Sequence, residues 1–195
     1  AALTRLRQLS LDPALVDERY EGVGSAKIDL LCSHLEQIVP AGHQVLVFSQ
    51  FVSFLERIDS SLKQRGISCL LLEGKTRKRE DVIAKFRRGE GSVFLISLKA
   101  GGVGLTLTEA DYVYIMDPWW NPSVEAQAIN RAHRIGQNRA VNVYRLVAQD
   151  TIEEKVCQLQ AHKQRLIDTV VDDVGDESTQ RMDIDQLIEL LGVGE

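Results

Sequence analysis

Apolar strands and amphipathic helices alternate along most of the chain, and this alternation constrains the fold more than any other feature. Runs of almost continuous apolar residues predict strands at residues 44–48, 68–72, 92–96, 112–116 and 141–146. Such runs suit strands that are buried on both faces. We therefore predict an α/β fold with a mainly parallel sheet and helices on both faces of it.

Apolar residues at helical intervals lie between these runs and predict the covering helices. The predicted helices span residues 28–38, 51–62, 77–88, 123–135 and 151–171. The last is long and amphipathic, with its apolar side chains along one side. One compact α/β domain with appendages therefore accounts for the chain.

Residues 1–20 form a separate helical segment before this unit. Leu3, Leu6 and Leu9 have helical spacing, and the pattern breaks at Asp12, which is followed by proline. Two glycines then predict a flexible joint, with Ser25 as the N-cap of the next helix.

The acidic residues are concentrated at the other end of the chain. From residue 168 to 195 there are nine acidic residues against one arginine. We expect residues 172–180 to be a solvated linker and residues 184–191 a short helix. Outside residues 168–195 the chain carries 22 basic and 19 acidic residues, although its total net charge is −5.

Two regions of the remaining sequence are strongly basic. Residues 75–88 contain seven basic and two acidic residues, and residues 127–145 contain four arginines and no acid. Both regions could contact phosphate groups. For the basic helix at 77–88, a simple solvated face explains the pattern equally well.

Several classes of protein are disfavoured by the sequence. No apolar run reaches 18 residues and the first residues do not resemble a signal peptide, so we expect no membrane segment. Cys32, Cys69 and Cys157 lie far apart in apolar surroundings and form no CxxC pair. We expect buried thiols in a reducing compartment and no metal site.

A short glycine-lysine-threonine string at residues 74–76 resembles the end of a phosphate-binding P-loop. A P-loop requires GxxxxGK[ST], and here Cys69 stands at the first glycine position. Without that loop, backbone N–H groups cannot surround the phosphates. The chain also has no acidic motif of the DExx type that could hold magnesium, so we do not expect a complete ATPase.

Polar residues follow the predicted strand at 44–48. Ser49 and Gln50 stand directly after it. Ligands of open α/β sheets lie at the carboxyl ends of strands, so these residues could face a ligand. A helix cap would explain them equally well.

A glycine-rich block, SLKAGGVGLTLT, follows the strand at 92–96. Gly102 and Gly104 allow backbone amides to approach a phosphate, and Ser97 and Lys99 add hydrogen-bond donors. A tight structural loop is the alternative interpretation.

The predicted helix at 123–135 carries a third polar block, QAINRAHRIGQ. Gln127, Arg131 and Arg134 are spaced to share one helical face. Guanidinium groups in that arrangement can make paired hydrogen bonds to a γ-phosphate and stabilise charge in the transition state. A solvated polar face has the same spacing.

These three blocks resemble motifs IV, V and VI of superfamily-two helicases. The strings SLKAGGVGLTL, DPWWNP and QAINRAHRIGQ are similar to the Swi/Snf-related ATPase family in particular, and their short spacings resemble bacterial or archaeal members. The resemblance implies a RecA-like second motor lobe, a three-layer α/β sandwich, at residues 25–150. Residues 1–24 resemble the segment joining the two lobes, residues 151–171 resemble a brace helix, and residues 172–195 form an acidic tail.

The same resemblance assigns roles around the nucleotide. It implies that ATP and Mg²⁺ are held chiefly by a first lobe. Arg131 and Arg134 correspond to arginine fingers that reach across to it, and Gln127, Gly102 and Gly104 belong to the same nucleotide-binding surface.

On the DNA side, the resemblance places a second set of residues. Ser49, Gln50, Ser97 and Lys99 match positions near the tracking strand. Trp120 matches a tryptophan that couples DNA contact to hydrolysis. Trp119 stands where many relatives carry a polar residue, so we expect it to pack against the protein. The string at 74–76 with Arg79 matches the family's glycine-threonine-arginine turn.

The hypothesis that follows is a lobe of an ATP-dependent translocase on double-stranded DNA. Its implied partners are duplex DNA, the first RecA-like lobe of the same polypeptide, and a DNA-bound protein substrate. The full-length protein would be a DNA-dependent ATPase in the nucleus of a eukaryote or at the nucleoid of a prokaryote, whereas this lobe alone would be inactive. Two alternatives are a catalytically dead lobe that serves protein interactions and a lobe of an RNA-directed enzyme.

Overall fold

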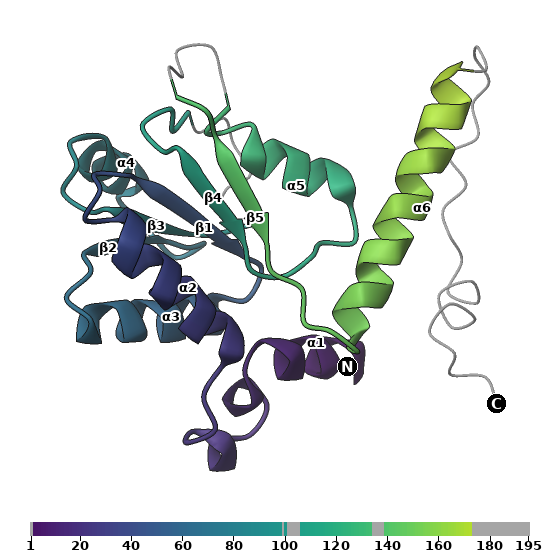
Figure 1. The fold of residues 1–195 in the computed structure, drawn as a ribbon, viewed down its shortest axis with the longest axis horizontal. Helices are drawn as coiled ribbons and strands as arrows, with labels where there is room; N and C mark the ends of the chain where they lie inside the picture. Colours follow the sequence, from purple (N-terminus) through teal and green to yellow (C-terminus); the bar gives the residue numbers. More distant parts are fainter. Residues whose placement is uncertain (1, 99, 101–105, 134–138, 173–195) are drawn as a thin grey trace.

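One parallel sheet forms the middle of the molecule in a computed structural model that describes residues 2–98, 100, 106–133 and 139–172. Its five strands follow the order β2-β3-β1-β4-β5 (Figure 1). The strands are β1 (Val45–Ser49), β2 (Cys69–Leu72), β3 (Val93–Ser97), β4 (Tyr112–Ile115) and β5 (Asn142–Arg145). Every described pairing is parallel, as predicted.

Helices cover both faces of this sheet. They are α1 (Ala2–Leu11), α2 (Ala26–Ile38), α3 (Val52–Gln64), α4 (Arg79–Arg87), α5 (Pro122–Ile129) and α6 (Ile152–Asp172), with short 3-10 helices at Pro13–Leu15 and Glu18–Tyr20. Side chains of α2 and α3 share one apolar core with the sheet, and those of α4 and α5 share a second core on the opposite face. The predicted three-layer α/β sandwich is confirmed.

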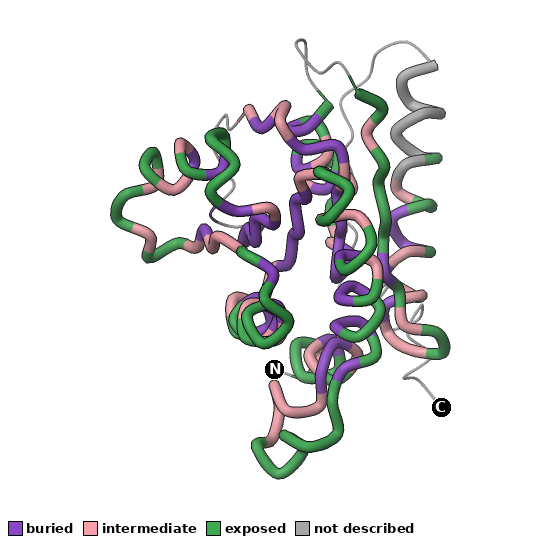
Figure 2. Tube along the Cα trace, turned by 60° about the vertical axis from the view of Figure 1, so that its left-hand side comes forward, coloured by how far each residue is buried: buried purple, intermediate pink, exposed green. Residues whose placement is uncertain are grey.

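The alternation of side chains along β1 shows how the sequence divides between these two cores. Val45 and Val47 belong to the core beneath α2 and α3, whereas Leu46 and Phe48 belong to the core beneath α4 and α5. All residues of β1 are buried, as are those of β3. A strand that is apolar at every position is therefore explained by burial on both faces (Figure 2).

Strand β5 departs from that pattern. It lies at the edge of the sheet beside β4, and all four of its residues are exposed. The prediction that every strand is covered on both faces is wrong here. The chain leaves the sheet after β5, and the start of α6 lies beside α1 (Figure 1).

Helix α5 is shorter than predicted. The spacing predicted a helix to residue 135, but α5 ends at Ile129 with Asn130 as its C-cap. Arg131 then lies in a turn, where its carbonyl accepts a hydrogen bond from the backbone N–H of Leu107 at 2.9 Å. Helix α5 therefore carries Gln127, whereas Arg131 lies just beyond its end.

The leucine spacing did not predict the buried face of α1 correctly. Leu6 and Leu9 are 49% and 42% exposed, whereas Arg7 and Leu11 are buried. The predicted break is confirmed, since Asp12 caps the following 3-10 helix. Ser25 caps α2 as predicted and also donates to the Leu11 carbonyl at 2.5 Å.

The cysteines and the chain end complete the comparison with the sequence. Cys32 is buried, but Cys69 and Cys157 are only partly buried, so the expectation of three buried thiols is corrected. The long helix predicted at 151–171 is present as α6. The predicted linker at 172–180, apart from Asp172 at the end of α6, and the helix at 184–191 lie outside the described residues.

Candidate functional site

The carboxyl edge of the sheet brings two of the predicted site residues together. Ser49 ends β1 and Ser97 ends β3, and the two are paired in the parallel register. Both are almost completely buried, with 0% and 1% of their surfaces exposed. The sequence placed them at this edge correctly, but their hydroxyl groups lie behind the surface.

Asp117 is the centre of the polar contacts at this edge. It follows β4 and accepts a hydrogen bond from the Ser49 hydroxyl at 2.5 Å. Gln50 donates to the same carboxylate through its side-chain amide and, at 3.3 Å, through its backbone N–H. Burial raises the pKa of Asp117, while the hydrogen bonds from Ser49 and Gln50 oppose that shift.

Arg7 of α1 completes this group of four side chains, which we call the carboxyl-edge cluster (Arg7, Ser49, Gln50, Asp117). Its Nη1 donates to Gln50 Oε1 at 2.8 Å, and its Nη2 lies 3.6 Å from Asp117 Oδ2. Arg7 is 5% exposed. The cluster therefore ties the segment before the sheet to the ends of β1 and β4.

The turn that carries the two tryptophans is held by a second buried carboxylate, Glu125 of α5. Glu125 accepts hydrogen bonds from the Trp119 backbone N–H at 2.7 Å, from Arg145 at 2.5 Å and from Gln160 at 2.7 Å. Gln160 of α6 also donates to the Trp119 carbonyl. Trp119 packs against the core beneath α4 and α5, as expected, and Trp120 remains partly exposed.

A buried ion pair joins α6 to the sheet. Lys27 of α2 lies 2.6 Å from Glu153 of α6 and also donates to the backbone carbonyls of Met116 and Leu146. Burial lowers the pKa of Lys27 and raises that of Glu153, and their mutual attraction opposes both shifts. Helix α6 is therefore anchored at its first turn.

The described ends of the glycine-rich block at residues 97–108 contact two arginines, Arg79 and Arg131. Arg79 at the start of α4 donates to the carbonyl of Ala100 at 2.8 Å, and the Leu107–Arg131 hydrogen bond described above lies at the other end of the same block. Arg131 is 8% exposed, whereas Gln127 is exposed on α5. Lys99, Gly102, Gly104 and Arg134 lie outside the described residues.

Comparison with known proteins identifies the family of this chain. The description "Helicase conserved C-terminal domain" matches residues 26–136. The chain belongs to the helicase C-terminal domain family. This helicase lobe is 48% identical over 148 residues to DNA repair protein RAD5B of Arabidopsis thaliana, covering 73% of the lobe and 12% of the relative.

A second relative and a solved structure are of the same kind. The lobe is 42% identical to the Arabidopsis thaliana protein CHROMATIN REMODELING 24, over 76% of the lobe and 14% of that relative. The crystal structure of the C-terminal part of the Fun30 ATPase domain superposes with a TM-score of 0.66 and 39% identity, covering 70% of this chain and 45% of that one. The matched relatives are Swi/Snf-type ATP-dependent helicases. The helicase lobe spans only a small part of the length of the two Arabidopsis proteins and less than half of the Fun30 chain.

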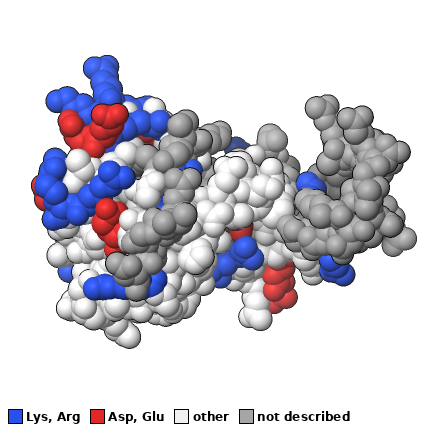
Figure 3. Space-filling model, turned by 90° about the horizontal axis from the view of Figure 1, so that it is seen from above, with Lys and Arg blue, Asp and Glu red and all other residues white. Residues whose placement is uncertain are grey.

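The basic residues of the helicase lobe gather around α4. Figure 3 shows Lys and Arg side chains over the end of the molecule where α4 lies. Lys75, Lys85, Arg87 and Arg88 are exposed there, and Arg88 pairs with the exposed Glu90 at 2.6 Å. This surface can attract phosphate groups at long range.

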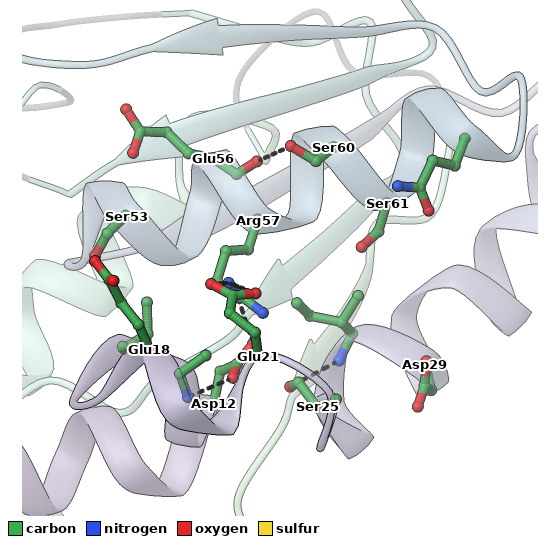
Figure 4. A pocket seen from close by; sticks show the side chains of 15 residues that line it. Asp12, Glu18, Glu21, Ser25, Asp29, Ser53, Glu56, Arg57, Ser60 and Ser61 are labelled. Carbon is green, nitrogen blue, oxygen red and sulfur yellow. Dashed lines mark hydrogen bonds and ion pairs between the residues drawn. The ribbon is translucent and has the colours of Figure 1, made fainter.

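A cavity elsewhere among the described residues of the lobe has the opposite charge. A cavity of about 610 Å³ lies between α3 and the segment before α2 (Figure 4). Asp12, Glu21, Asp29 and Glu56 are among its lining residues, and Arg57 pairs with Asp12 at 2.6 Å and with Glu21 at 2.9 Å. Carboxylates repel phosphate, so this cavity does not suit a nucleotide.

Metal-ligand groups and membrane-spanning helices were also sought among the described residues. Within the described ranges, no three His, Cys, Asp or Glu side chains come close enough together to hold a metal ion. None of the described helices is long and apolar enough to cross a membrane.

Sequence reasoning missed the residues that organise the site, namely Arg7, Lys27, Asp117 and Glu125. Asp117 carried a signal, because it directly follows the apolar run at 112–116 just as Ser49 follows the run at 44–48. Arg7 and Leu11 are four residues apart on α1, and that spacing could have identified the buried face. Glu125 and Lys27 gave no signal, since their partners lie far away in the sequence.

Proposed function

We propose that this lobe is the second motor lobe of an ATP-dependent translocase on double-stranded DNA. The observation that carries the proposal is the family membership together with the helicase strings at residues 97–107, 117–122 and 127–137. Relatives named as DNA repair and chromatin remodelling proteins favour DNA over RNA as the track. The track would be followed through its backbone, without reading of base sequence.

On the nucleotide side, Arg131 and Arg134 supply guanidinium groups to the γ-phosphate of ATP held by a first lobe, and Gln127 is assigned to the same nucleotide-binding surface. The residues fit that ligand chemically, because guanidinium groups bind phosphate oxygens in pairs. Gly102 and Gly104 allow the backbone of the neighbouring loop to approach the nucleotide. Bound ATP with Mg²⁺ supplies the phosphoryl-transfer energy, and the lobe's own contribution is to stabilise the charge that develops on the phosphate.

On the DNA side, we assign Ser49, Gln50, Ser97, Lys99 and Trp120 to the contact with the tracking strand. The placement of Ser49, Gln50 and Ser97 along one edge of the sheet supports this assignment. The exposed basic side chains around α4 provide additional contact with the duplex backbone. A DNA-bound protein would be the object that the motor moves.

The test is hydrolysis of ATP by the full-length protein with and without duplex DNA. Arg131→Ala and Arg134→Ala should each lower the DNA-stimulated rate by about a thousandfold, as expected for an arginine finger. Arg5→Ala, which replaces an exposed arginine of α1, is the matched control and should keep the wild-type rate.

Three results would contradict the proposal. Wild-type hydrolysis in both arginine variants would remove the finger assignment. Absence of ATP hydrolysis in the intact protein would favour a catalytically dead lobe that serves protein interactions. Stronger stimulation by RNA than by duplex DNA would assign the lobe to an RNA-directed enzyme.

A further inference from the structure

One buried arginine joins segments that lie far apart in the sequence. Arg7 of α1 donates to Gln50 Oε1 at 2.8 Å and to the Pro118 carbonyl at 2.6 Å. Its guanidinium carbon also lies 5.6 Å from the ring centres of Phe51 and Trp120. A single side chain thus contacts both the segment after β1 and the turn after β4.

The geometry of these contacts requires an arginine. Two nitrogen atoms of one planar group donate to different acceptors while the guanidinium carbon lies over two aromatic rings, and a lysine ammonium cannot do all of this at once. A lysine at position 7 would keep a positive charge near Asp117 but could not donate two hydrogen bonds from one planar group.

Stability alone does not explain a buried arginine at this position. Arg7 is 5% exposed, and its Nε is buried without a hydrogen-bond partner among the described residues. Burial also lowers the pKa of its guanidinium group. A methionine or leucine would fill the space without these costs, so the guanidinium group is explained by what it positions.

The turn contacted by Arg7 is also held from its other side. Gln160 of α6 donates to the carbonyl of Trp119, next to Trp120. Helices α1 and α6 contact each other outside the sheet. Two appended helices therefore hold the same turn, one through Arg7 and one through Gln160.

We infer that Arg7 is a positioning residue that links the segment joining the two lobes to the DNA-facing residues Gln50 and Trp120. A change in the position of α1, as the lobes close, moves the group that orients Gln50 and the Trp120 ring. DNA contact and lobe closure are thereby coupled through one side chain. This inference rests on the proposed function, since it assumes a first lobe and a DNA track.

The experiment compares Arg7→Lys with Arg5→Lys in the full-length protein. Arg5 lies on the same helix and is exposed, so the two variants make the same chemical change in different surroundings. For each variant we would measure ATP hydrolysis without DNA, kcat and KM for duplex DNA, and the midpoint of thermal unfolding.

Arg7→Lys should lower the DNA-stimulated kcat by about tenfold, in the range seen when residues between two coupled sites are changed. The KM for DNA and the rate without DNA should remain close to the wild type, because Arg7 is buried and the charge beside Asp117 is kept. The thermal midpoint should fall modestly, because a lysine cannot keep the hydrogen bonds to both Gln50 and Pro118. Arg5→Lys should match the wild type in all four measurements.

The possible results distinguish a failure of the role proposed for Arg7 from a failure of the proposed function. A wild-type kcat in Arg7→Lys, or an equal fall of both rates together with a lower thermal midpoint, would overturn the positioning role and leave the proposed function intact. A higher KM with unchanged kcat would overturn it too, because Arg7 would then be a DNA-binding residue. Absence of DNA stimulation in the wild-type protein would overturn the proposed function as well.

Discussion

The carboxyl edge of the sheet and the surface around α4 both carry charged side chains, but the two regions use them in opposite ways. Arg7 and Lys27 at the edge are 5% and 7% exposed, and each bonds to groups from distant segments. Lys85 and Arg88 near α4 are exposed. The buried charges hold the architecture together, while the exposed charges remain available for a polyanion.

This difference follows from solvation. A buried charge loses its hydration and must be compensated by partners at fixed positions, so removing one partner leaves a large cost. An exposed charge keeps its hydration, and its pairs contribute little to stability. Substitutions in the two regions should therefore have very different effects on folding.

Breaking the buried ion pair should have the largest effect. Lys27→Met leaves the Glu153 carboxylate, which is 0% exposed, with the backbone N–H of Ala148 as the remaining donor that we identify. The free energy of unfolding, measured with urea, should fall by about 3–5 kcal/mol. The double variant with Glu153→Leu should recover most of this loss, and an equally unstable double variant would contradict the explanation.

Removing the second buried carboxylate should have the next largest effect. Glu125→Ala leaves the Trp119 N–H and the Gln160 amide without their shared acceptor, which should cost about 2–3 kcal/mol in urea unfolding. Arg145→Ala removes only the partner whose side chain is 45% exposed, and should cost less than about 1 kcal/mol. Equal losses would show that Glu125 is stabilised mainly by Arg145.

Cys69 is partly buried, so it lies between the buried charges of the carboxyl edge and the exposed charges around α4. The titration of its thiol tests how partial burial affects stability. Burial raises the pKa of its thiol to about 12, and the hydrogen bond to Asp59 adds to the shift. In the unfolded chain the thiol ionises near its ordinary value of 9.0, so the stability that it contributes is present below that pH and is lost as the pH rises from 9.0 toward 12.

Alkylation measures this directly. At pH 8, Cys69 should react far more slowly in the folded protein than in urea, because the thiolate is the reactive form. A Cys69→Ser variant identifies the signal. Fast alkylation of Cys69 in the folded protein would contradict the raised pKa.

Substitutions around α4 should have the smallest effect on folding. Arg88→Ala and Lys85→Ala remove exposed charges, so the urea midpoint should stay unchanged. Affinity for duplex DNA should fall similarly for different sequences, and the slope of log affinity against log salt should decrease by about 1 for each phosphate that the variant no longer neutralises. Glu80→Ala is a control that changes an exposed residue of the same helix with the opposite charge.

Much of the fold could be predicted because its signals are local. The apolar runs located β1 to β4 within one or two residues, since a strand between two helical layers must be apolar at every position. The same reasoning failed for β5, where an apolar run lies at an exposed edge. It also extended α5 beyond Ile129, because helical spacing continues in the sequence after the helix has ended.

The sequence predicted the candidate site only for residues at the ends of strands. Ser49 and Ser97 stand directly after apolar strands, and the sheet brings them together. The interactions of Arg7 with Pro118 and of Lys27 with Glu153 join residues separated by 111 and 126 positions. Nothing in the local sequence distinguishes Arg7 from the exposed Arg5 except its spacing from Leu11.

The sequence by itself determined the layers, the parallel sheet and the family, because hydrophobic periodicity and the helicase strings are local properties of the chain. The tertiary structure alone decided which charges are buried and which segments they join. The physical reason is that hydration is lost only when distant segments close over a side chain. Arg7, Asp117 and Trp120 thus become one unit only in the folded lobe.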